Sequence, residues 1–266
     1  MHALVKLVVS DVDGTLIYKG SYLNTARFPV MLKNLGDLNI PFCVATGRHY
    51  RELKKLFGNY CDTILCVCCD GAYAVFANKL LFGIPVGTEA VKIFFDAFVG
   101  KNIPVEFHSP DTTYILGASP LFHSKEKSRL SEIKVISSPD EAEGEIFMIS
   151  VYGNICTNAD LKNFTLPGNL RVSYSSGNIS EFVSSNASKY GSVSKIASSC
   201  GISEKDILFF GDGQSDAELI EKCALSYTTY CADRKVFRLT GNHTRDVIGT
   251  LIRLSSEWKK QKQKQN

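Results

Sequence analysis

The alternation of short apolar segments with helix-like segments constrains the fold of this chain more than any other feature. Apolar runs at 4–10, 40–45 and 63–69 are separated by helix-like stretches at 28–38 and 49–57. Runs of this length bounded by turn residues are typical of buried strands. Strands that alternate with helices pair in parallel through crossover helices. The N-terminal third is therefore predicted to be α/β.

The last third of the chain repeats this alternation. A helix-like stretch at 192–200 precedes an apolar run at 206–210, and a second helix-like stretch follows at 217–223. We expect this apolar run to join the strands of the N-terminal third in one parallel sheet. Both ends of the chain then form a single Rossmann-like core.

The middle of the chain has a different character. An amphipathic helix is predicted at 88–100. Five strand-like segments follow, at 103–108, 112–117, 145–152, 170–174 and 179–183. Hairpins with a helix are typical of an α+β unit with an antiparallel sheet. We therefore predict a core at 1–83 and 185–258 and an inserted domain at 84–184.

Composition excludes several classes of protein. The chain has 266 residues, 44% of them hydrophobic and 21% charged, which fits a globular protein of one or two domains. Its longest apolar runs are far shorter than the ~20 residues that cross a bilayer, and its first residues lack the pattern of a signal peptide. Nine cysteines, an odd number, favour reduced thiols; the Cys-x-Cys-Cys run at 66–69 is predicted to be a buried strand in preference to a metal site. We expect a cytoplasmic protein without membrane contact.

The formal net charge of +3 arises at the C-terminal end, where four lysines occupy 259–266. Without this segment the basic and acidic residues nearly balance, so the composition indicates no nucleic-acid surface. We predict that 259–266 is a disordered basic tail, with a polybasic interaction segment as the alternative. No obligate protein partner is evident.

Two aspartates directly follow the first predicted strand. The run Asp-x-Asp-Gly-Thr at 11–15 places Asp11 and Asp13 at the carboxyl end of that strand, where open α/β sheets bind ligands. Side chains at i and i+2 of an extended chain point to the same side, so the two carboxylates repel unless a cation lies between them. A nearby phosphate increases this electrostatic repulsion, since each like-charge pair at ~4 Å costs about 4 kcal/mol at an effective dielectric constant of about 20. The alternative is a turn rich in Asp and Gly.

A second acidic loop follows another predicted strand. The run Gly-Asp-Gly-Gln-Ser-Asp at 211–216 brings further acids to the same edge of the sheet, although by itself it also fits an ordinary Gly/Asp loop. Carboxylate, carbonyl and water oxygens are the ligands that Mg²⁺ prefers, and such an ion allows a carboxylate to attack phosphorus. The predicted metal ligands are the acids of both loops, Asp11, Asp13, Asp212 and Asp216.

Two further segments offer groups for a phosphate. Thr46, Gly47 and Arg48 follow the strand at 40–45 and are predicted to open a helix, where a hydroxyl and backbone amides hold phosphate oxygens and also cap the helix. Lys189 is placed at the head of the predicted helix that runs to Cys200, and it supplies a positive charge. A lysine in that place taken alone is usually a solvated surface group.

In this order, the four elements Asp-x-Asp-Gly-Thr, Thr-Gly-Arg, a lysine opening a helix and Gly-Asp-Gly-x-x-Asp resemble the haloacid dehalogenase superfamily. The insertion before the lysine is similar to the α/β cap, of the C2B kind, of its Cof-type (subfamily IIB) sugar-phosphatase branch. The resemblance covers the chain up to about residue 254. It implies a phosphatase that uses Mg²⁺ and acts on a small phosphorylated metabolite.

The resemblance also implies roles for the motif residues. Asp11 is then the nucleophile and a metal ligand, and Asp13 is the general acid and base and a metal ligand through its carbonyl. Asp212 ligates the metal through its side chain, and Asp216 supports the site. Phosphate passes from the substrate to Asp11 and from there to water, while the second acid first protonates the leaving oxygen and then activates the water.

In the same reading, Thr46 and Lys189 bind the transferring phosphoryl group, and Gly47 and Arg48 lie beside it. The cap excludes bulk water and supplies contacts that select the substrate. Candidates for these contacts are His108, His123 and Tyr114, with a structural or solvated position as the alternative for the histidines.

Three positions depart from the family's pattern. Ser215 stands where an asparagine is usual, which removes an amide near the metal and predicts altered metal binding. Asp70 replaces the asparagine of Asn-Gly-Ala, and Tyr190 replaces the glycine after the motif lysine; both are expected near the phosphate pocket. Two alternatives stay open. One is a phosphomutase, which shares the core and the intermediate; the other, prompted by these departures, is a non-enzymatic phosphate-binding regulatory protein.

Overall fold

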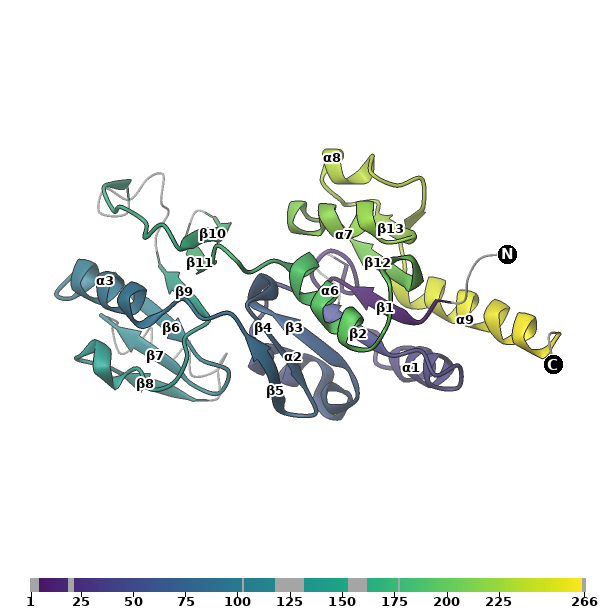
Figure 1. Ribbon diagram of the computed structural model, residues 1–266, viewed down its shortest axis with the longest axis horizontal. Helices are drawn as coiled ribbons and strands as arrows, with labels where there is room; N and C mark the ends of the chain where they lie inside the picture. Colours follow the sequence, from purple (N-terminus) through teal and green to yellow (C-terminus); the bar gives the residue numbers. More distant parts are fainter. Residues whose placement is uncertain are drawn as a thin grey trace.

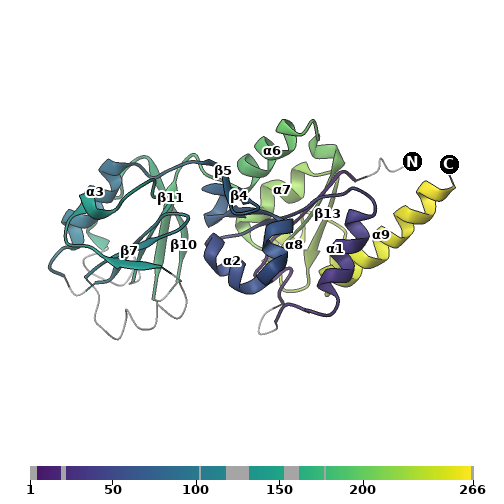
Figure 2. The same cartoon turned by 90° about the horizontal axis from the view of Figure 1, so that it is seen from below.

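The computed structural model describes residues 5–18, 22–101, 103–117, 132–152, 162–176 and 178–264. They form two bodies, each built on its own sheet, that lie side by side along the long axis of the molecule (Figure 1). Helix α9 (Val247–Gln263) lies at the end of the larger body that is farthest from the smaller one (Figure 2).

The larger sheet has eight strands within the described residues, in the order β14-β13-β12-β1-β2-β3-β4-β5. They are β1 (Leu7–Ser10), β2 (Phe42–Ala45), β3 (Leu65–Cys68), β4 (Tyr73–Phe76), β5 (Lys79–Gly83), β12 (Ile207–Gly211), β13 (Leu225–Thr229) and β14 (His243–Thr244). Neighbours from β14 to β3 pair in parallel, whereas β3, β4 and β5 pair antiparallel. Strand β1 lies between β2 and β12, so the two ends of the chain share one sheet, as predicted.

Helices cover both faces of this sheet (Figure 1). They are α1 (Phe28–Gly36), α2 (Tyr50–Phe57) and α9 on one face, and α6 (Lys189–Ser199), α7 (Ala217–Lys222) and α8 (Arg234–Phe237) on the other. Val8 of β1 packs into the cluster with the first three helices, and its neighbours Leu7 and Val9 pack into the cluster with the other three. Because successive side chains of a strand point to opposite faces, a sheet covered on both sides requires the continuous apolar runs seen in the sequence.

The smaller sheet forms the cap, in the order β10-β11-β9-β6-β7-β8. Its strands are β6 (Val105–His108), β7 (Thr113–Leu116), β8 (Ile133–Val135), β9 (Met148–Val151), β10 (Leu170–Ser175) and β11 (Ser180–Ser184). All neighbours pair antiparallel except β7 and β8. Helix α3 (Thr88–Phe98) packs on it, with the rings of Phe94 and Phe182 5.1 Å apart between centroids. Every strand of the cap lies within the predicted insertion 84–184.

The prediction of a disordered tail at 259–266 is wrong for residues 259–263. They continue helix α9, and the Nζ atom of Lys259 lies 2.9 Å from Oδ1 of Asn34 and 2.8 Å from Oδ2 of Asp37. Lysine and glutamine are good helix formers, and α9 packs beside α1, which extends the helix past the point where apolar residues end. Among the described helices, none is long and apolar enough to cross a membrane.

The segment after β3 differs from the prediction. The strand expected at 63–69 ends at Cys68, and a turn over Cys69–Gly71 with positive φ at Cys69 and Asp70 redirects the chain into the hairpin β4–β5. This hairpin extends the core sheet with two antiparallel strands that the apolar pattern did not predict. The cysteines at 66, 68 and 69 are buried, as predicted.

Candidate active site

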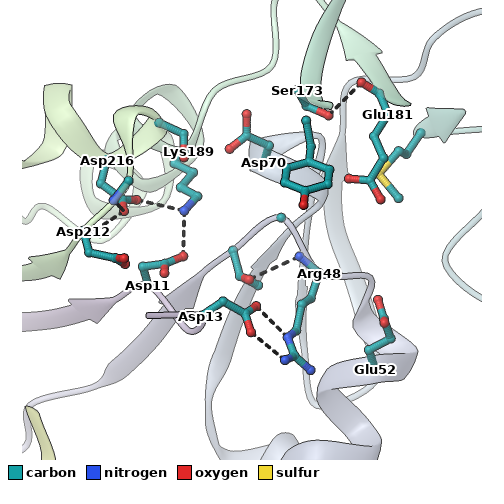
Figure 3. Close-up of a pocket in the computed structure, with 16 residues that line it drawn as sticks. Asp11, Asp13, Arg48, Glu52, Asp70, Ser173, Glu181, Lys189, Asp212 and Asp216 are labelled. Atoms are coloured by element: carbon teal, nitrogen blue, oxygen red, sulfur yellow. Dashed lines mark hydrogen bonds and ion pairs between the residues drawn. The ribbon is translucent and has the colours of Figure 1, made fainter. Parts of the chain in front are cut away.

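The two acidic loops meet at the carboxyl ends of β1 and β12. These strands are parallel neighbours, and the amide of Asp11 donates a hydrogen bond of 2.8 Å to the carbonyl of Phe210. The loops face a cavity of about 490 Å³ between the core and the cap (Figure 3). The prediction that acids after separate strands come together at one sheet edge is therefore correct in its geometry.

Lys189 lies between two buried carboxylates. Its Nζ atom is 2.7 Å from Oδ1 of Asp11 and 2.8 Å from Oδ1 of Asp216, and the exposed fractions of Lys189 and Asp11 are only 4% and 5%. Ser188 is the N-cap of α6, the helix that begins with Lys189, and its side chain accepts a hydrogen bond from the amide of Gly191. A surface position for this lysine is excluded.

Burial and charge act in opposite directions on this pair. Burial raises the pKa of Asp11 well above its usual range, while the Lys189 ammonium opposes that shift. Burial also disfavours the charged form of Lys189, but Asp11 and Asp216 outweigh it, so the pKa of the lysine is raised. The lysine therefore stays protonated, and a further cation beside Asp11 would favour its ionised, nucleophilic form.

Asp216 has a structural task in this arrangement. Its Oδ2 atom accepts hydrogen bonds from the amides of Asp212 and Gly213, at 3.1 and 3.0 Å, and its Oδ1 atom accepts from Lys189. Both oxygens therefore hold the loop and the lysine. Of the two acids predicted in this loop, Asp212 is the one whose carboxylate lies against the first loop, where Thr15 Oγ1 donates to its Oδ1 at 2.6 Å.

The donor set fits a divalent cation. Carboxylate oxygens of Asp11, Asp212 and Asp216 lie within 4.8 Å of one another, and one lysine faces this group. Gly14 allows the loops to approach so closely, because its φ is +83° and a Cβ atom there would lie 2.2 Å from Oδ2 of Asp212. Three carboxylates at such distances repel unless a second cation joins the lysine.

Arg48 lines the cavity and also contacts the second acid of the first loop. Its Nε and one terminal nitrogen donate to the two carboxylate oxygens of Asp13 at 2.7 and 2.6 Å (Figure 3). The hydrogen bond with Asp13 is the main cause that raises the pKa of the guanidinium. The side chain of Asp13 is 57% exposed, in contrast to the buried Asp11 only two residues away. The two acids therefore have different surroundings, which suits different chemical roles.

Thr46 and Gly47 line the cavity, but they do not cap a helix. Helix α2 begins later, and its N-cap is His49, in a capping box with Glu52. The predicted N-cap role of the segment 46–48 is therefore wrong, because one further turn of chain separates the strand from the helix. Thr46 is buried, and its Oγ1 atom accepts a hydrogen bond from the amide of Arg48 at 3.2 Å.

Comparison with known proteins decides the family. The haloacid dehalogenase-like hydrolase family matches residues 8–246, nearly the whole chain. The chain belongs to this family. The predicted family and hydrolase class are thus confirmed.

Relatives of this hydrolase carry phosphatase names. A Buchnera aphidicola protein described as a putative phosphatase is 28% identical over 225 residues, covering 81% of this chain and 82% of the relative. The Escherichia coli 5-amino-6-(5-phospho-D-ribitylamino)uracil phosphatase YbjI is 21% identical over 236 residues, covering 84% of each chain.

Solved structures share the fold of this hydrolase. A haloacid dehalogenase-like hydrolase from Bacteroides thetaiotaomicron superposes with a TM-score of 0.80 at 16% identity, covering 94% of this chain and 99% of the other. A haloacid dehalogenase subclass IIB sugar phosphatase superposes with a TM-score of 0.73 at 17% identity, covering 96% and 98%. The predicted fold, a Rossmann-like core with an inserted α+β cap, is confirmed.

The cap of this hydrolase adds residues that sequence reasoning missed, namely Met148, Ser173, Tyr174 and Glu181. Neighbours in a regular strand point to opposite faces, yet Ser173 and Tyr174 both line the cavity. The register of β10 against β11 shifts between Val172 and Tyr174, and such a bulge redirects side chains. No local sequence pattern predicts this bulge.

The cap candidates named from the sequence have other tasks. His108 is buried and contacts the hydroxyls of Thr113 and Ser150 at 3.0 and 2.9 Å. The hydroxyl of Tyr114 donates to the carbonyl of Glu143, and the ring packs in the core of the cap. Both have a structural role and neither lines the cavity, and His123 lies outside the described residues.

Of the three positions that depart from the family's pattern, two line the cavity and one does not. Ser215 and Asp70 line the cavity, as predicted. Tyr190 does not belong to the cavity wall; its hydroxyl donates to Glu204, which lies in the turn between α6 and β12. The expectation that this tyrosine affects the phosphate pocket is therefore wrong.

Proposed function

We propose that this hydrolase is a magnesium-dependent phosphatase that cleaves a small phosphate monoester, such as a sugar phosphate, through an aspartyl-phosphate on Asp11. The observation that carries the proposal is the Asp11 carboxylate, held at the end of β1 within 2.7 Å of the Lys189 ammonium and within reach of Asp212. The phosphatase names of the relatives support the same reaction.

In this proposal the carboxylates of Asp11 and Asp212 and the backbone carbonyl of Asp13 hold Mg²⁺. Asp216 contributes indirectly, since it anchors Lys189 and the loop that carries Asp212. The bound ion supplies positive charge that allows an anionic nucleophile to approach an anionic phosphate.

The side chains of the site then have separate roles in the reaction. An oxygen of Asp11 forms a bond to phosphorus as the bond from phosphorus to the leaving oxygen breaks. Asp13 gives its proton to that oxygen, and afterwards takes a proton from the water that hydrolyses the aspartyl-phosphate. Thr46, Gly47 and Lys189 hold the phosphoryl oxygens, which stabilises the charge that spreads over them.

The cap supplies the leaving-group side of the cavity through Met148, Ser173, Tyr174 and Glu181. We propose that residues 84–184 act as one unit that excludes bulk water and selects the substrate. A cytoplasmic location is part of the proposal, because the nine cysteines lie mostly in apolar segments of a mid-sized chain.

Asp13→Asn is expected to separate the two chemical steps. The variant keeps Asp11 and the carbonyl of residue 13, so an activated ester such as p-nitrophenyl phosphate still phosphorylates it. Breakdown of the phosphoenzyme slows by roughly 10²- to 10⁴-fold, the contribution of a positioned acid or base. The measurement is a rapid-quench time course of bound and free inorganic phosphate. Breakdown at the wild-type rate would contradict the role of Asp13, and transfer of phosphate to a sugar instead of water would indicate a mutase.

Metal removal tests the proposed cation site. Dialysis against EDTA is expected to abolish phosphate release, and Mg²⁺ is expected to restore it. Mg²⁺ at about 100 times its dissociation constant should also raise the free energy of unfolding by about 2.7 kcal/mol, which thermal denaturation detects without any substrate. Asp212→Asn should lose most of this stabilisation, whereas Asp246→Asn, a change at the N-cap of α9, should keep it. Full turnover in EDTA would remove the metal from the mechanism.

A further inference from the structure

We propose that Arg171 of the cap neutralises Asp70 of the core and thereby sets the affinity of the active site for the phosphoryl group. The inference rests on the proposed function, since it assigns a phosphate to the cavity. Arg171 is a positioning residue here, because it acts on the phosphate through Asp70 and Lys189 and does not line the cavity.

Asp70 lies in a strained turn that touches both phosphate-binding segments. Its φ is +55°, a conformation that non-glycine residues rarely adopt, so the surroundings hold the turn in place. The amide of Asp70 donates to the carbonyl of Thr46 at 2.9 Å, and the hydroxyl of Ser192 on α6 donates to the carbonyl of Gly71 at 2.6 Å. The turn therefore joins the Thr46 segment to the helix that begins with Lys189.

The carboxylate of Asp70 is placed where it would oppose a phosphate. It lines the same cavity as Asp11 and Lys189, its side chain is only 8% exposed, and Figure 3 shows it on the Lys189 side of the site. Its negative charge is among those that raise the pKa of Lys189. Without a cation of its own, Asp70 would repel the phosphoryl oxygens and compete with them for the lysine.

Arg171 supplies that cation from the cap. One terminal nitrogen of its guanidinium lies 2.7 Å from Oδ2 of Asp70 and 2.8 Å from the carbonyl of Ala187, and its Nε donates to the same carbonyl at 3.1 Å. Ala187 lies two residues before Lys189, in the segment that returns the chain from cap to core. A guanidinium has several donors in a fixed plane, so it can span both acceptors at once.

Loss of Arg171 is therefore expected to weaken the binding of phosphate while the fold is retained. We expect Arg171→Met to raise the dissociation constant for inorganic phosphate on the order of tenfold in the presence of Mg²⁺, with a parallel rise in KM, because the Asp70 carboxylate is left uncompensated. Asp70→Asn alone should leave phosphate binding as tight as in the wild type or tighter. The double variant should recover most of the lost affinity, since its residue 70 carries no charge.

The test is a double-mutant cycle measured by isothermal titration calorimetry with inorganic phosphate, with KM and kcat for a sugar phosphate as a second readout. Arg253→Met serves as the matched control, because Arg253 forms an exposed ion pair with Glu257 on α9. If Arg171→Met does not fold, Arg171→Lys takes its place in the cycle, since lysine keeps the charge but cannot span both acceptors. The dissociation constant of Arg171→Lys for inorganic phosphate should exceed that of the wild type, and adding Asp70→Asn should lower it again.

Two results would overturn the inference: phosphate affinity in Arg171→Met equal to that of the wild type, or a double variant as weak as Arg171→Met. The second result would mean that Arg171 affects phosphate binding only through its hydrogen bonds to the carbonyl of Ala187, which hold the backbone in place. Failure of the proposed function looks different, because it appears as a wild-type protein that releases no phosphate from any ester while the calorimetric cycle can still be measured.

Discussion

Asp11→Asn is expected to reduce phosphate release to background, a fall on the order of 10⁴-fold or more, as for other removed nucleophiles. The amide keeps the shape of the side chain but lacks the anion that attacks phosphorus. It also removes one charge from the group of acids around Lys189. The measurement is rapid acid quench followed by mass spectrometry of the peptide 7–27, which should carry phosphate in the wild type and none in the variant.

Stability provides the internal control for this variant. Burial raises the pKa of Asp11, which means that the ionised carboxylate destabilises the metal-free fold at neutral pH. Asp11→Asn should therefore unfold at the same temperature as the metal-free wild type or higher, so that lost activity cannot be attributed to unfolding. Normal phosphorylation of this variant, or phosphate on Asp13 in the wild type, would overturn the assignment of the nucleophile.

Lys189→Met is expected to damage both stability and turnover. The lysine is the cation shared by Asp11 and Asp216, and all three side chains are buried. Removal of one partner from a buried charge group costs about 3–5 kcal/mol, because the remaining carboxylates lose their compensation. Turnover should fall by roughly 10²- to 10³-fold, the usual effect of removing one group that stabilises developing charge. Thermal denaturation and phosphate-release assays measure the two effects separately.

Two variants sharpen this prediction. Lys189→Met combined with Asp216→Asn should regain part of the stability, since it removes one uncompensated carboxylate, but it should not regain activity. Lys222→Met changes an exposed lysine in the last turn of α7 and should alter neither quantity. A stable and fully active Lys189→Met protein would show that the lysine has no role in the site.

The larger body and the position of its reactive edge could be predicted from local sequence. Continuous apolar runs separated by helix-like segments require a sheet covered on both faces, and parallel strands bring their carboxyl ends to one edge. Asp11, Thr46 and Asp212 each follow such a strand directly. Their convergence therefore depends only on strand order and direction, which the alternation of strands and helices indicates.

Ion pairs between residues that are distant in the chain could not be predicted from local sequence. Asp13 forms an ion pair with Arg48, which is 35 positions away in the sequence. Arg171 forms one with Asp70, which is 101 positions away. Hydrophobic periodicity reports which face of an element is buried, but it does not report which charged groups meet across two elements. Arg48 lines the cavity, as the sequence indicates, but its pairing with Asp13 could not be predicted for this reason.

By itself, the sequence determined the α/β core, the inserted antiparallel cap and the acids at the ends of β1 and β12, because burial patterns and strand direction are encoded locally. Only the tertiary structure decided that Asp216 anchors Lys189, that a bulge turns Ser173 and Tyr174 into the cavity, and that α9 continues past Lys259. Each of these depends on separate segments of the chain that come into contact only once the chain has folded, so no local pattern encodes them.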